Sequence, residues 1–303
     1  MSEHHHHHHH TVSGKNLFLT ILLNILITVS QIIGGVLSGS LALLSDAMHN
    51  FSDVLSLIIA YAAHRLAERP NTQQRTFGYK RAEILAAFFN AALLIGIGIF
   101  LIIEAFHKFY HPEVVNSIWV IALGLLSILL NTLSVLLIRD DAHDNMNIKA
   151  AYLHLLTDVM TSVAVVAGGL LMYYFDLFWI DPLISVLIAL YLVWASIGIV
   201  RESLSILMQF SPSNININEI VNAIETDKNI QNVHHIHLWR LNDKMVHLEA
   251  HLDFSQNLTL EDTGKVIESL EKLLRHQFHI THTTFQAEYK RADDKSMIHK
   301  QET

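Results

Sequence analysis

Residues 41–63 read LALLSDAMHNFSDVLSLIIAYAA, a largely apolar run interrupted by Asp46, His49 and Asp53. A helix that crosses a membrane needs roughly 20 mainly apolar residues, so this run is long enough to cross one. A carboxylate at the centre of such a helix costs on the order of 2.5–3.5 kcal/mol on an insertion scale. The run therefore predicts a membrane helix whose acidic residues serve a function.

Five further runs of similar length complete a set of six predicted spans. They cover about residues 17–37, 82–106, 117–138, 148–174 and 180–208. Ser38-Gly39-Ser40 predicts a tight break before the run at 41–63. The segment 176–182 predicts another break, because Pro182 suits the first turn of a helix. The predicted fold class is an α-helical membrane protein with a six-helix transmembrane bundle.

The composition supports a membrane protein and excludes several other classes. Of 303 residues, 51% are hydrophobic and 16% are charged, against roughly 25% charged residues in soluble proteins. So apolar a chain can bury ample surface, which excludes general disorder. The net charge of -8 argues against a nucleic-acid partner. Because cysteine is absent, disulfides and thiolate metal sites are excluded.

The basic residues predict the orientation of the spans. Lys and Arg collect in two loops, the first with Arg65, Arg69, Arg75, Lys80 and Arg81, the second with Arg139 and Lys149. Loops rich in Lys and Arg usually face the cytoplasm. We therefore expect an integral multi-pass protein of a bacterial inner (plasma) membrane, with both termini in the cytoplasm.

The polar C-terminal part predicts a small α+β domain. Helices are expected at 216–226 and 259–277, strands at 232–241, 245–254 and 281–289, and a hairpin turn at Asn242-Asp243. This order, αββαβ, suits two helices on one face of a sheet. The predicted domains are a His-rich cytoplasmic segment (1–16), a transmembrane domain (17–210), a cytoplasmic domain (211–290) and a flexible tail (291–303).

Two predicted membrane helices carry the same short motif. His49 and Asp53 are four residues apart, as are His154 and Asp158, so each pair shares one helix face. Two imidazoles and two carboxylates make a four-ligand set suited to zinc. Two carboxylates balance a divalent ion, and protons could replace it, which is the physical basis of metal/proton antiport. The alternative is that these groups only tie helices together. Asp46 remains open between a structural and a proton-handling role.

Three segments together resemble the cation diffusion facilitator family of zinc transporters. They are GSLALLSDAMHNFSD at 39–53, RTFGYKRAE at 75–83, and His154-x-x-x-Asp158. The resemblance covers nearly the whole chain. It implies a homodimer that exports zinc from the cytoplasm against inward proton flow, with transport ligands at His49, Asp53, His154 and Asp158. It also implies a ferredoxin-like cytoplasmic domain that is similar to a metallochaperone.

Two positions depart from some members of that family. Some bacterial members use histidines around the Phe-Gly motif for a second metal site, but this sequence has Arg75 and Tyr79 there. We therefore expect no metal site in this loop and interpret 75–81 as a basic stretch that lies at lipid phosphates.

The cytoplasmic domain offers further histidines. Strand alternation places His247, Glu249, His251 and Asp253 on one face. By similarity to the family, His251, His282 and Glu288 are the best ligand positions, and His234 could bridge to a second ion. A solvated sheet face is the alternative. Alternation puts His235 and His237 together and His234 opposite, so the three are not expected to share one site.

The run His4–His10 is either an expression tag or a native metal-collecting arm, and we favour the second. Other functions also stay open. One is transport of a broader set of divalent ions (Cd, Co, Ni, Fe), and another is a membrane metal sensor. A metalloenzyme is disfavoured because the zinc-protease motif His-Glu-x-x-His is absent, so we expect no enzyme activity.

Overall fold

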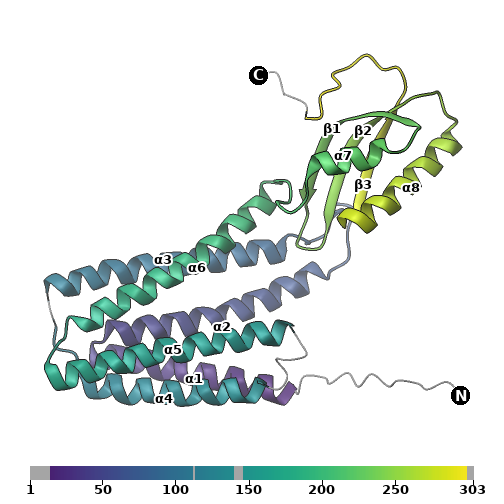
Figure 1. Cartoon of the computed structure of the whole chain (residues 1–303). Coiled ribbons are helices and arrows are strands. Elements are labelled where there is room, and N and C mark those ends of the chain that lie inside the picture. Colours follow the sequence, from purple (N-terminus) through teal and green to yellow (C-terminus); the bar gives the residue numbers. More distant parts are fainter. Residues whose placement is uncertain (1–13, 112, 140–145, 299–303) are drawn as a thin grey trace, which may run out of the picture. The chain divides into compact units, whose positions relative to one another are not determined.

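A computed structural model describes residues 14–111, 113–139 and 146–298 of the chain (Figure 1). The His4–His10 run lies outside these residues. The chain divides into two compact units, which are described separately. The first comprises residues up to Tyr61 together with Phe89–Ile199, and the second comprises Ala62–Phe88 together with the residues from Val200 onward.

Six long helices coincide with the six predicted spans. They are α1 (Gly14–Ser38), α2 (Leu41–Ala67), α3 (Ala82–Tyr110), α4 (Ser117–Ile138), α5 (Met146–Phe175) and α6 (Ile180–Leu207). Five of the described helices are long and apolar enough to cross a membrane, and α2 is not among them. Its length is sufficient, but Asp46, His49 and Asp53 make its sequence more polar.

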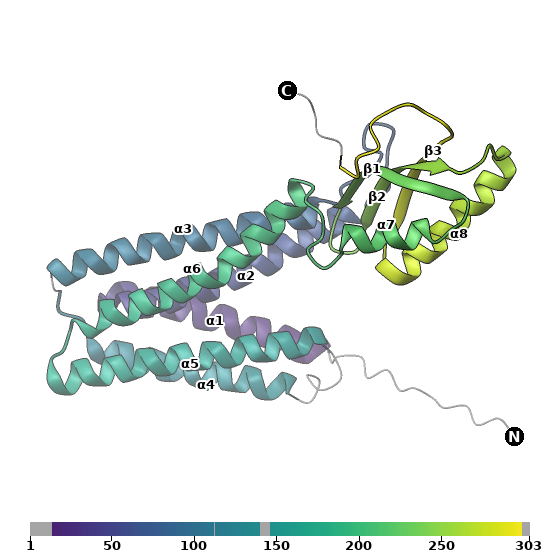
Figure 2. The same cartoon turned by 45° about the horizontal axis from the view of Figure 1, so that its top comes forward.

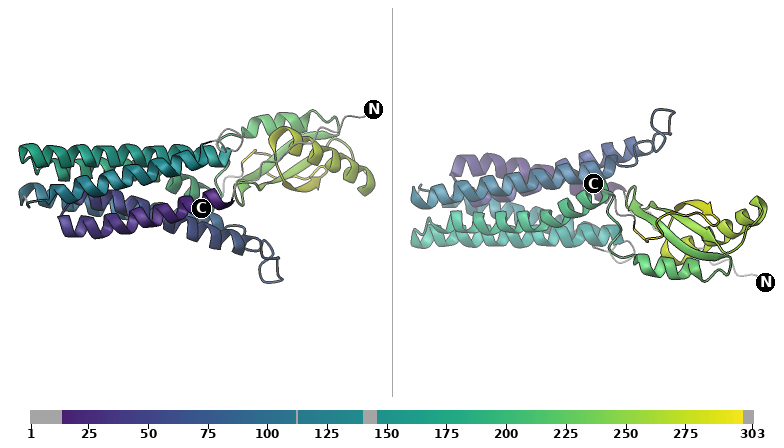
Figure 3. Two further views of the ribbon diagram at one scale, coloured as in Figure 1. Left: turned by 90° about the horizontal axis from the view of Figure 1, so that it is seen from below. Right: turned by 90° about the horizontal axis from the view of Figure 1, so that it is seen from above.

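Small residues let three helices of the first unit pack closely. Helix α4 lies alongside α5 and also contacts α1 (Figures 1 and 3). At the α4–α5 contact, a Cβ added to Gly124 would lie only 2.5 Å from Cγ2 of Val166. A Cβ added to Gly169 would lie 2.9 Å from Ile121. Glycines of this kind allow membrane helices to approach backbone to backbone, which fixes the position of α5.

The start of α2 is held by an acidic side chain of α6. Gly39, with φ at +70°, makes the turn between α1 and α2, as the sequence predicts. The buried Asp181 carboxylate accepts hydrogen bonds from Leu41 N at 2.7 Å and Ala42 N at 3.3 Å. The first amides of a helix lack partners within it. Asp181 therefore satisfies two of them and fixes where α2 begins.

The C-terminal part of the second unit is an α+β domain (Figure 2). Its elements are α7 (Ile217–Glu225), β1 (Ile230–Arg240), β2 (Val246–Phe254), α8 (Leu260–Phe278) and β3 (His282–Glu288). The sheet order is β1-β2-β3, with β1 and β2 antiparallel and β2 and β3 parallel. This confirms the predicted order of helices and strands. Asn242 also makes the expected turn, because its side chain accepts from Lys244 N and Met245 N.

One apolar face of the sheet packs against both helices. Ile224 of α7 and Leu274 of α8 are fully buried together with Leu248 and Leu252 of β2. The other residues of β2 alternate to the opposite, polar face. The candidate ligands of this domain therefore lie on the side of the sheet away from the two helices.

The segment after β3 differs from the expected flexible tail. Ser296 O accepts a hydrogen bond from His235 N at 3.3 Å, and Met297 O accepts one from Ile236 N at 2.9 Å. Both donors belong to β1, which is an edge strand of the sheet. An edge strand leaves its backbone groups unpaired, so a chain segment that covers it gains hydrogen bonds. Residues 291–298 are therefore docked on the domain.

Candidate metal centres

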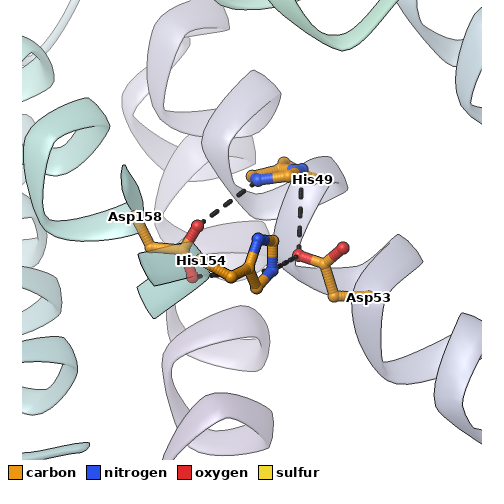
Figure 4. Close-up of side chains that lie close together, drawn as sticks. All are labelled: His49, Asp53, His154 and Asp158. Atoms are coloured by element: carbon orange, nitrogen blue, oxygen red, sulfur yellow. Dashed lines mark ion pairs between the residues drawn. The ribbon is translucent and has the colours of Figure 1, made fainter. Parts of the chain in front are cut away.

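Helices α2 and α5 bring the four predicted transport residues together (Figure 4). His49 Nε2 lies 3.3 Å from Asp158 Oδ1, and His154 Nε2 lies 3.1 Å from Asp53 Oδ2. Within each helix, His49 Nδ1 is 3.7 Å from Asp53 Oδ2, and His154 Nε2 is 3.9 Å from Asp158 Oδ2. The four side chains thus form a closed ring of alternating imidazoles and carboxylates.

Four polar atoms of this ring are buried without hydrogen-bond partners among the described residues. Both ring nitrogens of His49, Asp53 Oδ2 and Asp158 Oδ1 lack a partner among the described residues. The side chains of His49 and Asp158 are only 8% and 2% exposed, whereas His154 is 44% exposed. Buried polar atoms normally have partners, so unpaired ones need an explanation. An ion that enters from the side of His154 would supply the missing partner.

The spacing of the four ligand atoms approaches that of a tetrahedral metal site. Ligands at about 2.0–2.1 Å from zinc lie about 3.3–3.4 Å from one another in a tetrahedron. The contacts of 3.1–3.9 Å around the ring use both nitrogens of His49 and both oxygens of Asp158, whereas a metal takes one nitrogen from an imidazole. One ligand atom from each residue can be chosen so that all four lie within 4.8 Å of one another, so the four side chains must contract to hold a zinc-sized ion.

Asp46 lies in a separate polar network. It accepts hydrogen bonds from Gln31 Nε2 of α1 at 2.5 Å and from Thr161 Oγ1 of α5 at 3.0 Å. Ser162 Oγ donates to the same carboxylate at 3.2 Å, and Asn50 Nδ2 donates to Gln31 Oε1 at 2.9 Å. The network joins α1, α2 and α5, so it orients the two helices that carry the ring of ligands.

The cytoplasmic domain gathers a second group, formed by His234, His251, Glu288 and Asp293. His251 Nδ1 lies 3.0 Å from Glu288 Oε1, and His234 Nε2 lies 3.5 Å from Glu288 Oε2. Asp293 Oδ2 is 3.7 Å from His234 Nε2. Both nitrogens of the buried His234 lack a hydrogen-bond partner in the part of the chain that the structure describes. We refer to these four residues as the cytoplasmic cluster.

The structure does not bring His282 into this cluster. Strand β3 runs parallel to β2 in a register that pairs His282 with His247 and Glu288 with Asp253. The rings of His282 and His247 lie 4.8 Å apart. Burial lowers the pKa of His247, and the neighbouring His282 lowers it further. The structure therefore does not bring His282 together with His251, because His251 pairs with Gln286, four residues further along β3.

A bulge in β1 also changes the predicted faces of the histidines. His235 has φ at +51°, and the pairing with β2 shifts between His234 and His237. His234 consequently pairs with His251, and His237 pairs with Glu249. A bulge reverses the alternation of the residues that follow it. His234 and His237 therefore lie on the same face, contrary to the simple alternation.

The docked tail supplies one residue of the cytoplasmic cluster, and the sequence reasoning missed it. Asp293 belongs to a run, Arg291-Ala292-Asp293-Asp294-Lys295, that looked like a solvated end. Its dense mixture of charges was the available signal. In the loop at 75–81, the Arg75 guanidinium lies 4.8 Å over the Tyr79 ring.

Comparison with known proteins identifies the class of protein to which the chain belongs. Residues 17–208 match the family model described as the cation efflux transmembrane domain, and residues 212–290 match the cytoplasmic domain of cation efflux proteins. The chain is a multi-pass membrane protein that transports metal cations. It belongs to the cation diffusion facilitator family, as the motifs predict.

Three relatives show the range of the family. The "Cadmium, cobalt and zinc/H(+)-K(+) antiporter" of Bacillus subtilis is 36% identical, over 85% of this chain and 83% of the relative. The "Metal cation efflux system protein CzcD" of Cupriavidus metallidurans is 34% identical, over 86% and 82%. The "Zinc transporter ZitB" of Pectobacterium atrosepticum is 33% identical, over 93% and 88%. All three are named for transport or efflux and none for an enzyme activity.

Proposed function

We propose that this protein exports zinc from the cytoplasm in exchange for protons, with His49, Asp53, His154 and Asp158 as the transport ligands. The observation that carries the proposal is the ring of these four side chains, whose buried nitrogen and oxygen atoms lack other partners. The ring lies on helices of a transmembrane domain, where an uncompensated carboxylate is costly. Among the described residues, only His49 and His154 form ion pairs with the two aspartates of the ring.

Charge balance explains why zinc and protons compete for the ring. Asp53 and Asp158 carry two negative charges, and their ion pairs among the described residues involve only the two imidazoles. A divalent ion neutralises the ring when the imidazoles are neutral, as metal ligation requires. Protons on His49 and His154 would neutralise it equally well. The site therefore avoids a buried net charge in both states, and each ion lowers the affinity for the other.

The transport cycle follows from this exchange. Zinc enters from the cytoplasm and binds the four ligands, and the helices rock to open the site on the opposite side. Protons then lower the affinity for zinc, the metal leaves, and the protonated ring returns. The name of the Bacillus subtilis relative, an antiporter that acts with protons, supports this coupling. The basic loops support an orientation with both termini in the cytoplasm.

The metal range and the assembly are part of the proposal. Imidazole ligands favour zinc and its neighbours over manganese or magnesium. Two relatives have zinc in their names, and one also has cadmium and cobalt, which supports zinc as the main substrate with cadmium and cobalt as further ones. The match of residues 212–290 to a family labelled ZT_dimer supports a homodimer. The cytoplasmic cluster is proposed as a second, regulatory zinc centre.

The test is zinc uptake into inside-out vesicles under an imposed pH gradient. Asp158→Asn keeps the size of a nearly inaccessible side chain and removes its charge, and we expect it to abolish uptake. Asp176→Asn is the matched control, because Asp176 is an exposed loop residue whose positive φ asparagine tolerates. Uptake by this control should equal that of the unchanged protein.

Two results would contradict the proposal. Normal zinc uptake by Asp158→Asn means that the ring is not the transport site. Uptake that is the same with and without the pH gradient means that protons are not the exchanged ion. Cross-linking in native membranes tests the homodimer separately.

A further inference from the structure

The cytoplasmic cluster already contains a cation supplied by the chain itself. Lys295 Nζ lies 2.9 Å from Asp253 Oδ2 and 3.2 Å from Glu288 Oε2, and it also pairs with Asp293. Three carboxylates from two strands and the tail thus surround one ammonium group. Glu288 and Asp293 are also among the four residues that could hold a metal.

The docked tail holds Lys295 in this place. The hydrogen bonds from His235 N and Ile236 N to Ser296 O and Met297 O fix the backbone directly after Lys295. Arg291 Nη1 donates to Glu288 Oε1 at 3.0 Å and so fixes the tail on the other side. The ammonium group is therefore positioned by backbone and side-chain contacts rather than by its own charge alone.

The charges at the cluster are strongly coupled. Burial raises the pKa of Glu288, but hydrogen bonds from Lys295 and Gln286 outweigh it, so the pKa lies below its ordinary value. The hydrogen bond from Lys295 lowers the pKa of Asp293 to about 2. Burial lowers the pKa of Lys295, but Asp253, Asp293 and Glu288 outweigh burial and raise it. Lys295 therefore stays charged throughout the physiological range.

An ammonium group satisfies only part of the cluster. It has three donors and no acceptor, so it serves the carboxylate oxygens. The nitrogens of His234 and Nδ1 of His251 still lack hydrogen-bond partners among the described residues. A metal ion would bind one nitrogen of His234, Nδ1 of His251 and the carboxylate oxygens at once. Lysine and metal therefore compete for the carboxylates, while only the metal uses the imidazoles.

We propose that Lys295 is a tethered counter-ion that holds the cytoplasmic cluster when no metal is bound, and that a metal ion must displace it. This inference rests on the proposed zinc centre at the cluster. Displacement weakens zinc binding, because the contacts of the ammonium group are lost when the metal enters. It also frees the Lys295 side chain, so that occupancy of the centre is reported by a change in the tail.

The experiment uses the full chain in the Asp158→Asn background, which removes the proposed transport site. Lysines are acylated briefly at increasing zinc concentrations, and the modified peptides are quantified by mass spectrometry. Lys290, which lies 5.1 Å over the Tyr289 ring in the same segment, is the internal reference. Zinc should increase acylation of Lys295 relative to Lys290. The same increase should be absent in a His234→Ala variant.

A second measurement tests the competition directly. Zinc affinity is determined against a chromophoric chelator, and the zinc bound by the His234→Ala variant is subtracted. Lys295→Met should bind zinc at the cluster about tenfold more tightly, because the contacts of the ammonium group no longer have to be broken when the metal enters; tenfold corresponds to about 1.4 kcal/mol. Lys290→Met, the matched control, should bind zinc with the same affinity as the protein without a substitution in the tail.

The outcomes separate this inference from the zinc centre on which it rests. If His234→Ala removes a zinc site but acylation of Lys295 ignores zinc, the counter-ion role is overturned and the centre stands. If Lys295→Met and Lys290→Met bind zinc with equal affinity, the counter-ion role is likewise overturned and the centre stands. If His234→Ala leaves zinc binding unchanged, the centre itself is wrong, and the role of Lys295 is overturned with it.

Discussion

Replacing Gly124 by alanine tests whether close packing of α4 on α5 positions the proposed transport ligands. The new Cβ would lie 2.5 Å from Val166 Cγ2, whereas carbon atoms in contact are separated by about 3.5–4.0 Å. Valine in a helix has essentially one χ1 rotamer, so Val166 cannot turn away. The two helices must therefore separate by about 1 Å, and overpacking of this kind costs about 1–3 kcal/mol.

The consequence for the metal site follows from the position of Val166. It lies two helical turns, or about 12 Å, beyond Asp158 on α5. Displacement of α5 would move His154 and Asp158 away from His49 and Asp53 and so widen a ligand set that must contract to hold a metal. We expect Gly124→Ala to melt at a lower temperature in detergent and to raise the zinc concentration needed for half-maximal uptake.

Gly96→Ala on α3 is the matched control, because no atom outside its own helix lies within 4 Å of the added Cβ. Alanine is favoured over glycine in a helix by about 1 kcal/mol, so this variant should melt at or above the original temperature. The packing argument is refuted if Gly124→Ala melts no lower than Gly96→Ala, or if its uptake curve is unchanged.

Two further predictions concern the two parts of the chain that carry the proposed metal centres. His49→Asp exchanges an imidazole for a carboxylate, which suits manganese better, so competition uptake should show a weaker preference for zinc over manganese; an unchanged preference would argue against His49 as a ligand. Thr259 caps α8 by accepting a hydrogen bond from Asp262 N at 3.2 Å, so Thr259→Ala should destabilise the cytoplasmic domain by about 1 kcal/mol. Amide exchange in α8 measures this, and exchange as slow as in the unchanged protein would contradict it.

The membrane helices and the two His–Asp pairs of the proposed transport site were predictable because both depend on local patterns. A spacing of four places His49 with Asp53 and His154 with Asp158 on single helix faces, whatever the rest of the fold. The break at Gly39 and the turn at Asn242 likewise follow from the conformational preferences of single residues. The approach of α2 to α5 was inferred from the chemistry of two imidazoles and two carboxylates, and the resemblance to a family implied the same four residues.

The cytoplasmic cluster was harder to predict because it depends on register. One bulge at His235 changes the face of the sheet on which the following residues of β1 lie, and no residue type in the sequence predicts such a bulge. The parallel pairing of β3 decides that Glu288, rather than His282, lies near His234. Asp293 and Lys295 could not be placed at all, since their positions depend on tail hydrogen bonds to an edge strand.

The carboxylate of Asp181 gives α2 a fixed pivot. Because it binds the amides of Leu41 and Ala42, the first turn of α2 cannot slide along α6 without losing both hydrogen bonds. His49 lies eight residues further along, about 12 Å from this point. A tilt of about 10° around the pivot therefore carries the imidazole about 2 Å sideways, a full metal–ligand bond length. A small angular movement at one end of the helix is enough to make or break the coordination shell.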